Sequence, residues 1–108
     1  MDLAAEAYRI SKLLPRAEEY RLTSQLLRAA TSVVANIAEG HGRGTRKDYA
    51  RHVRIARGSL SETEALLLLA VKVELVEQQQ VQRANQLSLE IGKMLTSLVA
   101  RLQADPSP

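Results

Sequence analysis

Apolar side chains recur every three or four residues along most of this chain, and no other feature restricts its fold as strongly. Over residues 22–37 the steps between apolar positions are four, three, four and four. This spacing places the side chains on one face of an α-helix, whereas a strand would show alternation with a period of two. The positions on this face are Leu22, Leu26, Ala29, Val33 and Ile37. The spacing therefore predicts helices that pack their apolar faces into a shared core.

Prolines and glycines divide the pattern into four predicted helices. Pro15 ends the first, at about residues 2–14, because proline lacks the amide hydrogen that a helix interior needs. The second begins within residues 16–20 and ends in the glycine-rich segment 40–44, where glycine can adopt the left-handed conformation that closes many helices. Thr45 is expected to cap the third helix, at about residues 46–74, and residues 77–82 lead into the fourth.

Each of the other predicted helices also has one apolar face. These faces contain Leu3, Ala7, Ile10 and Leu14 in the first helix, Tyr49, Val53, Ala56, Leu60 and Leu67 in the third, and Ala84, Leu87, Ile91, Met94 or Leu95, Leu98 and Leu102 in the fourth. Short connections between long helices imply antiparallel neighbours. We therefore expect an all-α fold, an antiparallel up-down-up-down four-helix bundle, with a single domain over residues 1–104 and a disordered tail at 105–108.

Several classes of enzyme and metalloprotein lack their usual residues in this sequence. Without cysteine there is no disulfide framework, thiolate metal site or cysteine nucleophile. His41 and His52 are eleven residues apart, which fits no common metal-binding pair, and the Glu-x-x-His pattern of di-metal bundles is missing. The segment 40–44 follows a predicted helix instead of a strand and lacks the lysine of a phosphate-binding loop. We therefore expect no catalytic residues, no metal, no cofactor and no enzymatic activity.

The sequence shows no segment suited to a membrane. No window approaches the roughly 18 uninterrupted apolar residues of a transmembrane helix. Residues 1–14 contain charged side chains where a secretory signal would be apolar. We therefore expect a cytoplasmic protein with no membrane partner.

A cluster of basic residues is the strongest candidate for a binding site. Residues 40–58 contain six basic residues and a single acidic one, Asp48. Their local net charge is +5, whereas the whole chain has +3. The six are Arg43, Arg46, Lys47, Arg51, Arg54 and Arg57. Five of them occupy an arc of roughly 140° on the predicted third helix, and guanidinium groups suit phosphate. The cluster therefore predicts binding of RNA or DNA phosphates, without base stacking because no aromatic residues are interleaved.

A second interpretation of the same basic cluster is pairing between subunits. Acidic residues gather further along the predicted third helix and just after it, at Glu62, Glu64, Glu74 and Glu77. In an antiparallel or rotationally symmetric assembly, the basic start of this helix in one subunit could meet the acidic end in another. The arginines would then hold the subunits together. Otherwise these arginines would form an ordinary solvated surface. The sequence leaves nucleic-acid binding and these structural interpretations open.

The leucine run at residues 66–69 predicts self-association. Four consecutive leucines point around the whole circumference of a helix, so a helix in a monomeric bundle would leave some of them in water. Burial against another copy of the chain would remove that apolar surface from solvent. Leu66, Leu68 and Leu69 are the expected contacts in such an oligomer.

Three longer motifs resemble a known family. They are Glu19-Tyr20-x-Leu22-Thr23-Ser24-Gln25-Leu26, Asn36-Ile37-Ala38-Glu39-Gly40 and Ile55-Ala56-Arg57-Gly58-Ser59-Leu60-x-Glu62-x-Glu64. With this combination the chain resembles the four helix bundle proteins associated with intervening sequences in bacterial 23S ribosomal RNA genes. The family's signature positions fall on Asn36, Glu39, Gly40, Arg43, Ser59, Glu62 and Glu64.

The resemblance implies an antiparallel bundle that forms a ring-like homopentamer and has no enzymatic activity. Members of the family usually have a longer first helix than the one predicted here. The resemblance also implies kinship with the accessory variability proteins of diversity-generating retroelements, which use a basic surface to bind nucleic acid and a reverse transcriptase. By that kinship alone, a reverse transcriptase is a further candidate partner.

Overall fold

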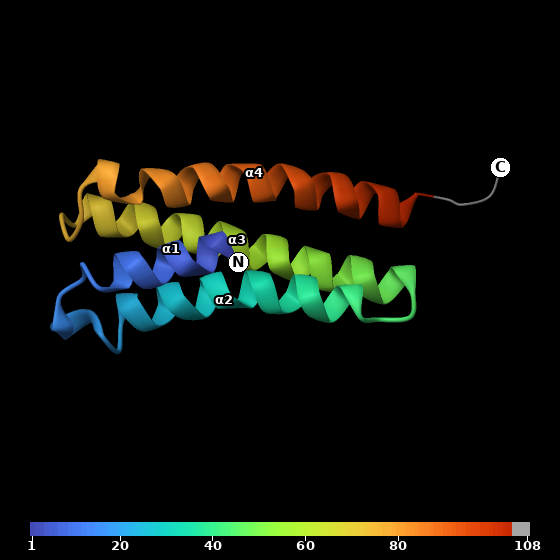
Figure 1. Cartoon of the computed structure of the whole chain (residues 1–108), viewed down its shortest axis with the longest axis horizontal. Coiled ribbons are helices and arrows are strands. Elements are labelled where there is room, and N and C mark those ends of the chain that lie inside the picture. The colour runs from blue at the N-terminus through green and yellow to red at the C-terminus, as the bar shows by residue number, and fades with distance from the viewer. Residues whose placement is uncertain (105–108) are drawn as a thin grey trace.

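The computed structural model describes residues 1–104, which form a bundle of four α-helices (Figure 1). Helix α1 spans Asp2–Ser11, α2 spans Leu22–His41, α3 spans Arg46–Lys72 and α4 spans Gln78–Gln103. Each helix packs against the next, and α1 also contacts α4. No strand occurs among residues 1–104. The predicted all-α, up-down-up-down bundle is confirmed, while the predicted tail at 105–108 lies outside the described residues.

The apolar faces predicted for the first three helices lie in the core. Every position on them is buried except Ile37 and Tyr49, which are half-buried and pack against the core. Leu26, Val53 and Leu67 are each no more than 1% exposed. Full burial of one such side chain stabilises a fold by about 1.5–3 kcal/mol relative to exposure. The helical period alone was therefore enough to identify most of the core.

The helix ends follow the sequence in part. The Thr45 hydroxyl accepts a hydrogen bond from the Asp48 amide at 3.1 Å, as expected of a cap for α3. The glycines after α2 are not left-handed, and Gly42 has a φ of −80°. Among residues 1–104, the residue with positive φ is instead Glu74, at 63°, just beyond α3. The expectation of a left-handed glycine was therefore wrong at α2, and a glutamate takes that conformation at α3.

Glu74 closes α3 in a Schellman-type arrangement. Its amide donates to the carbonyl of Val71 at 3.0 Å, and the amide of Leu75 donates to that of Ala70 at 2.9 Å. These two bonds satisfy carbonyls that have no partner within the helix. This pair of hydrogen bonds requires Glu74 itself to adopt the left-handed conformation, which explains its positive φ.

Helix α1 is much shorter than its neighbours, and its N-terminal end lies near the middle of the bundle (Figure 1). Beyond it, α2 and α4 leave an apolar hollow of about 720 Å³, lined in part by Val34, Ile91, Met94 and Leu98. Met94 is 67% exposed, and Ile91 and Leu98 are only half-buried. The apolar side of α4 that sequence predicted therefore faces partly into this hollow.

The face of α4 that is buried is rotated from the predicted one. It contains Val81, Ala84, Ser88, Leu95 and Val99. Of the predicted positions, Leu87, Ile91, Leu98 and Leu102 lie at its half-buried edge. The rotation arises because α3 covers α4 along most of its length, whereas α1 covers only part of it.

Within the described part of the chain, no helix combines the length and hydropathy needed to cross a bilayer.

Candidate nucleic-acid interface

All six residues of the predicted basic cluster are exposed. Arg43 lies in the connection between α2 and α3, and the other five lie on the first half of α3. The segment is helical because Thr45 caps it and because Val53 and Ala56 anchor its opposite face in the core. The cluster therefore forms one surface at the end of the bundle where α2 meets α3 and α4 ends (Figure 1).

Three of the six side chains have partners within the chain, and the first two of these are Arg43 and Arg46. Arg43 forms an exposed ion pair with Glu39, with Nη2 and Oε1 2.7 Å apart. The guanidinium of Arg46 donates to the main-chain carbonyls of Arg101 at 2.5 Å and Leu102 at 3.4 Å. A cation is favourable there because the last carbonyls of a helix carry partial negative charge. Arg46 therefore fastens the start of α3 to the end of α4.

Arg51 is linked to a buried histidine. Its Nη2 lies 3.2 Å from Nε2 of His52, and Nδ1 of His52 lies 3.1 Å from Oδ1 of Asn36 on α2. An amide oxygen and a guanidinium have fixed roles as acceptor and donor. With these partners, His52 donates from Nδ1 and accepts at Nε2.

The remaining cations are free of intramolecular partners. Among residues 1–104, the side chains of Lys47, Arg54 and Arg57 form no hydrogen bond or ion pair. The acidic residues suggested as pairing partners, Glu62, Glu64, Glu74 and Glu77, pair with none of the basic cluster in this part of the chain. Ion pairing within one subunit therefore does not occupy Lys47, Arg54 or Arg57.

Three of the family's seven signature residues, Asn36, Gly40 and Ser59, lie at the contact between α2 and α3. Ser32 Oγ and Ser59 Oγ are 2.8 Å apart across this interface. Asn36 Nδ2 donates to the Ser32 carbonyl at 2.9 Å, and its amide oxygen accepts from His52. A polar seam of four residues, Ser32, Asn36, His52 and Ser59, thus joins the helices.

Gly40 belongs to the same interface for a steric reason. A Cβ atom at Gly40 would lie 2.8 Å from His52 Cβ and 3.1 Å from Tyr49 Cδ1. Only a residue without a side chain allows α2 and α3 to come this close. By contrast, Glu39 and Glu62 are exposed, and Glu64 lines a groove between α3 and α4.

Sequence reasoning considered His52 only as a metal ligand and missed its structural role. Spacings of seven and eleven residues put His52 on the same side of α3 as Ser59 and Thr63. That polar line along an otherwise apolar face was the available signal. No group of three potential metal ligands gathers among the described residues.

The leucine run divides between the core and the surface. Leu67 is 1% exposed, Leu66 is half-buried, and Leu68 and Leu69 are 58% and 47% exposed. Leu66 and Leu69 share an outer face of α3 with two other apolar residues, Ile55 and Val73, which are 41% and 53% exposed. Leu68 lies roughly 100° around the helix from Leu69. We call Ile55, Leu66, Leu69 and Val73 the outer apolar stripe.

The chain is similar to known proteins both in sequence and in structure. The sequence profile of the 23S rRNA-intervening sequence protein family matches residues 1–97. A solved structure of a protein with unknown function from the S23 ribosomal protein family of Bacteroides thetaiotaomicron is similar, with a TM-score of 0.84 and 31% sequence identity. The match covers 91% of this chain and 92% of that chain. No curated protein sequence matches the chain. The chain belongs to the 23S rRNA-intervening sequence protein family.

Proposed function

We propose that the protein is a non-catalytic, self-assembling bundle that binds RNA or DNA through phosphate contacts at the basic surface. The observation that carries this proposal is the absence of partners for Lys47, Arg54 and Arg57 within residues 1–104. Unpaired cations that share one helix surface can each replace a counterion on a nucleic acid backbone. Arg51 adds a fourth cation, held by its neighbour His52.

The expected mode of binding is electrostatic. Tyr49 is half-buried against the core and is the only aromatic residue of the segment, so no stacking platform lies on this surface. Recognition would then be largely independent of base sequence and would weaken steeply with salt. A cytoplasmic location, where RNA and DNA are accessible, accords with this role.

Self-assembly would strengthen such binding. We propose that copies of the chain associate through the outer apolar stripe together with Leu68, in a homopentamer of the kind that the family resemblance implies. Burial of this surface would remove exposed apolar area from water. Repetition of the basic surface around a ring would also raise the local concentration of phosphate contacts.

The alternative is a protein-interaction scaffold without nucleic-acid binding, with a docked reverse transcriptase as one form of partner. Its support is the outer apolar stripe itself, because exposed apolar residues on one helix face are typical of protein contacts. In that case the basic residues would serve acidic surfaces of the partner or of other subunits. Nucleic-acid binding is favoured because no acidic residue of the described chain neutralises Lys47, Arg54 or Arg57.

Titration of structured RNA and duplex DNA at two salt concentrations tests the two proposals. We expect binding that weakens with salt, and an Arg51→Ala/Arg54→Ala variant whose logarithmic salt slope is smaller by roughly 2, since each lost phosphate contact contributes about 0.9. The matched control is Arg16→Ala/Arg83→Ala, which removes the same charge at the opposite end of the bundle. An equal loss of affinity and salt slope in both variants would show only an effect of net charge. The absence of binding even at low salt would favour the scaffold.

A further inference from the structure

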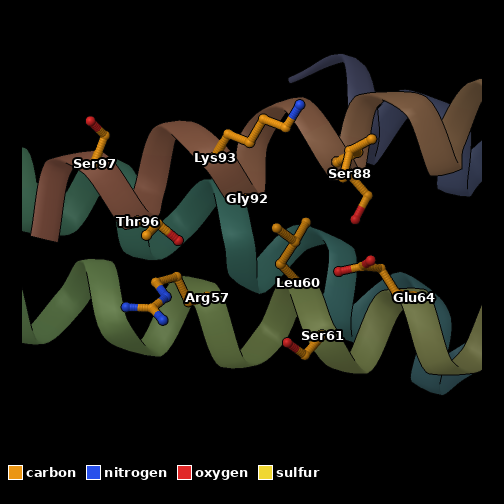
Figure 2. Close-up of a pocket in the computed structure, with 10 residues that line it drawn as sticks. Arg57, Leu60, Ser61, Glu64, Ser88, Gly92, Lys93, Thr96 and Ser97 are labelled. Atoms are coloured by element: carbon orange, nitrogen blue, oxygen red, sulfur yellow. The ribbon is translucent and has the colours of Figure 1, made fainter.

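An open groove of about 610 Å³ runs between α3 and α4 (Figure 2). Arg57, Ser61 and Glu64 line it from α3, and Ser88, Lys93 and Thr96 line it from α4. Its floor is apolar, because Leu60 lies against Gly92, where a Cβ would be 3.4 Å from Leu60 Cδ2. The groove thus combines two cations, one carboxylate and several hydroxyls above an apolar floor.

Ser88 lines this groove with a buried hydroxyl group. It is 0% exposed, and its hydroxyl has no hydrogen-bond partner among the described residues. In Figure 2 the hydroxyl points from α4 toward α3, between Leu60 and Glu64. Buried hydroxyl groups are normally hydrogen-bonded, since an unpaired one is unfavourable. A ligand that reaches the groove floor would supply the partner.

Charges of opposite sign are separated along the groove. Arg57 lies beside Thr96, and Glu64 lies opposite Ser88 (Figure 2). None of the three charged residues, Arg57, Lys93 and Glu64, forms an ion pair within residues 1–104. Arg57 and Glu64 are seven residues apart on α3, a rise of roughly 10 Å. The groove therefore offers an anion site at one end and a hydrogen-bond acceptor at the other.

We propose that this groove binds a single nucleotide unit. Arg57 and Thr96 hold the phosphate, and the sugar lies over Leu60 and Gly92. Glu64 accepts a hydrogen bond from the exocyclic amino group of the base, a contact that carboxylates make with amino-bearing bases. Ser88 completes the base site. The proposal rests on the proposed function through Arg57, which belongs to both surfaces, but Glu64, Ser88 and Lys93 belong to the groove alone.

Calorimetric titration of the full chain with nucleoside monophosphates tests the site. We expect adenosine and cytidine monophosphates to bind more tightly than uridine monophosphate, which lacks an amino group. Inorganic phosphate and free adenosine should each bind at least tenfold more weakly than adenosine monophosphate, roughly the loss of one charge-assisted hydrogen bond. Amide NMR spectra should show the largest shifts at Ser88, Gly92 and Thr96.

Variants separate the groove from the rest of the basic surface. Glu64→Gln should remove the preference for adenosine and cytidine monophosphates over uridine monophosphate. Arg57→Gln should weaken the binding of every nucleotide by roughly tenfold or more. Ser88→Ala should weaken binding without lowering the melting temperature, because its hydroxyl is unpaired in the free chain. The controls are Glu62→Gln and Arg28→Gln, which change the same charges at exposed positions outside the groove and outside the basic cluster.

The outcomes distinguish this proposal from the proposed function. A site for free nucleotides binds the monophosphate as tightly as a short single strand, whereas a site for an unpaired base in a strand binds the strand more tightly. Phosphate binding as tight as nucleotide binding, or no NMR shift at Gly92, would overturn the groove proposal even if RNA binds the basic surface. Nucleotide binding without salt-dependent RNA or DNA binding would support the groove and overturn the proposed function.

Discussion

The Asn36 amide oxygen and the His52 imidazole are hydrogen-bonded across the interface of α2 and α3, with Oδ1 and Nδ1 3.1 Å apart. Asn36 is held in this orientation because its Nδ2 donates to Ser32 on its own helix. His52 is only 7% exposed. The imidazole therefore has little access to water as an alternative partner. The pair therefore couples the packing of α2 against α3 to the neighbouring guanidinium of Arg51.

Replacement of this histidine should destabilise the bundle. His52→Ala leaves the Asn36 amide oxygen without its partner, and we expect the free energy of unfolding to fall by about 1–3 kcal/mol. Gln25→Ala is the control, because the Gln25 side chain is exposed on α2 and its replacement should change stability by no more than about 0.5 kcal/mol. Urea unfolding at a fixed protomer concentration measures both values, since stability in an oligomer depends on concentration.

A double-mutant cycle then shows whether the hydrogen bond itself is responsible. Asn36→Ala and His52→Ala should couple by at least about 0.5 kcal/mol, because each removes the partner of the other. Additive losses in the double variant would mean that the two residues stabilise the interface independently. That result would contradict the role of the pair.

Gly40 should tolerate no side chain. Gly40→Ala places a methyl group 2.8 Å from His52 Cβ, so the helices must shift apart, at a loss of about 1–3 kcal/mol. Gly58→Ala on α3 is the matched control, because nothing lies within 4 Å of the added atom. There the helix propensity of alanine should raise stability by about 1 kcal/mol. Thermal unfolding of both variants compares these opposite effects, and a neutral Gly40→Ala would disprove the close contact.

Glu74 offers a stabilising substitution. With a φ of 63° it lies in the left-handed region, which glycine adopts without strain. Glu74→Gly should therefore raise the free energy of unfolding by about 0.5–1 kcal/mol, with the greater entropy of the unfolded glycine as the opposing effect. Glu77 provides the contrast, because its φ of −90° at the start of α4 is open to any residue, so glycine relieves no strain there. Glu77→Gly should lower stability in the same unfolding measurement.

The fold could be predicted wherever local chemistry determines it. The Thr45 hydroxyl caps α3 by accepting a hydrogen bond from the amide of Asp48, three residues further along the chain. The burial of Leu26 and Val53 follows from helical spacing alone. The rotation of α4 could not be predicted, because it depends on how far the short α1 extends along its neighbours.

The candidate site was predictable as a cluster of charges but not as a set of contacts. Composition and spacing were enough to select Arg43, Arg46 and Arg54. The contact of Arg46 with the Arg101 carbonyl joins residues 55 positions apart, and it exists only because the start of α3 meets the end of α4. The unpaired hydroxyl of Ser88 likewise depends on how α3 and α4 pack, since serine alone carries no such signal.

The outer apolar stripe predicts how assembly can be broken. Leu69 and Val73 are 47% and 53% exposed, so Leu69→Lys/Val73→Lys should leave the bundle folded while placing two charges in a subunit contact. Light scattering should then show the 11.9 kDa monomer for this variant and a larger species for the original chain. Leu89→Lys is the control, because Leu89 is equally exposed at 59% but lies on α4, away from the stripe. A monodisperse monomer of the original chain at micromolar concentration would contradict self-assembly. Loss of assembly in the Leu89→Lys variant alone would instead move the subunit contact to α4.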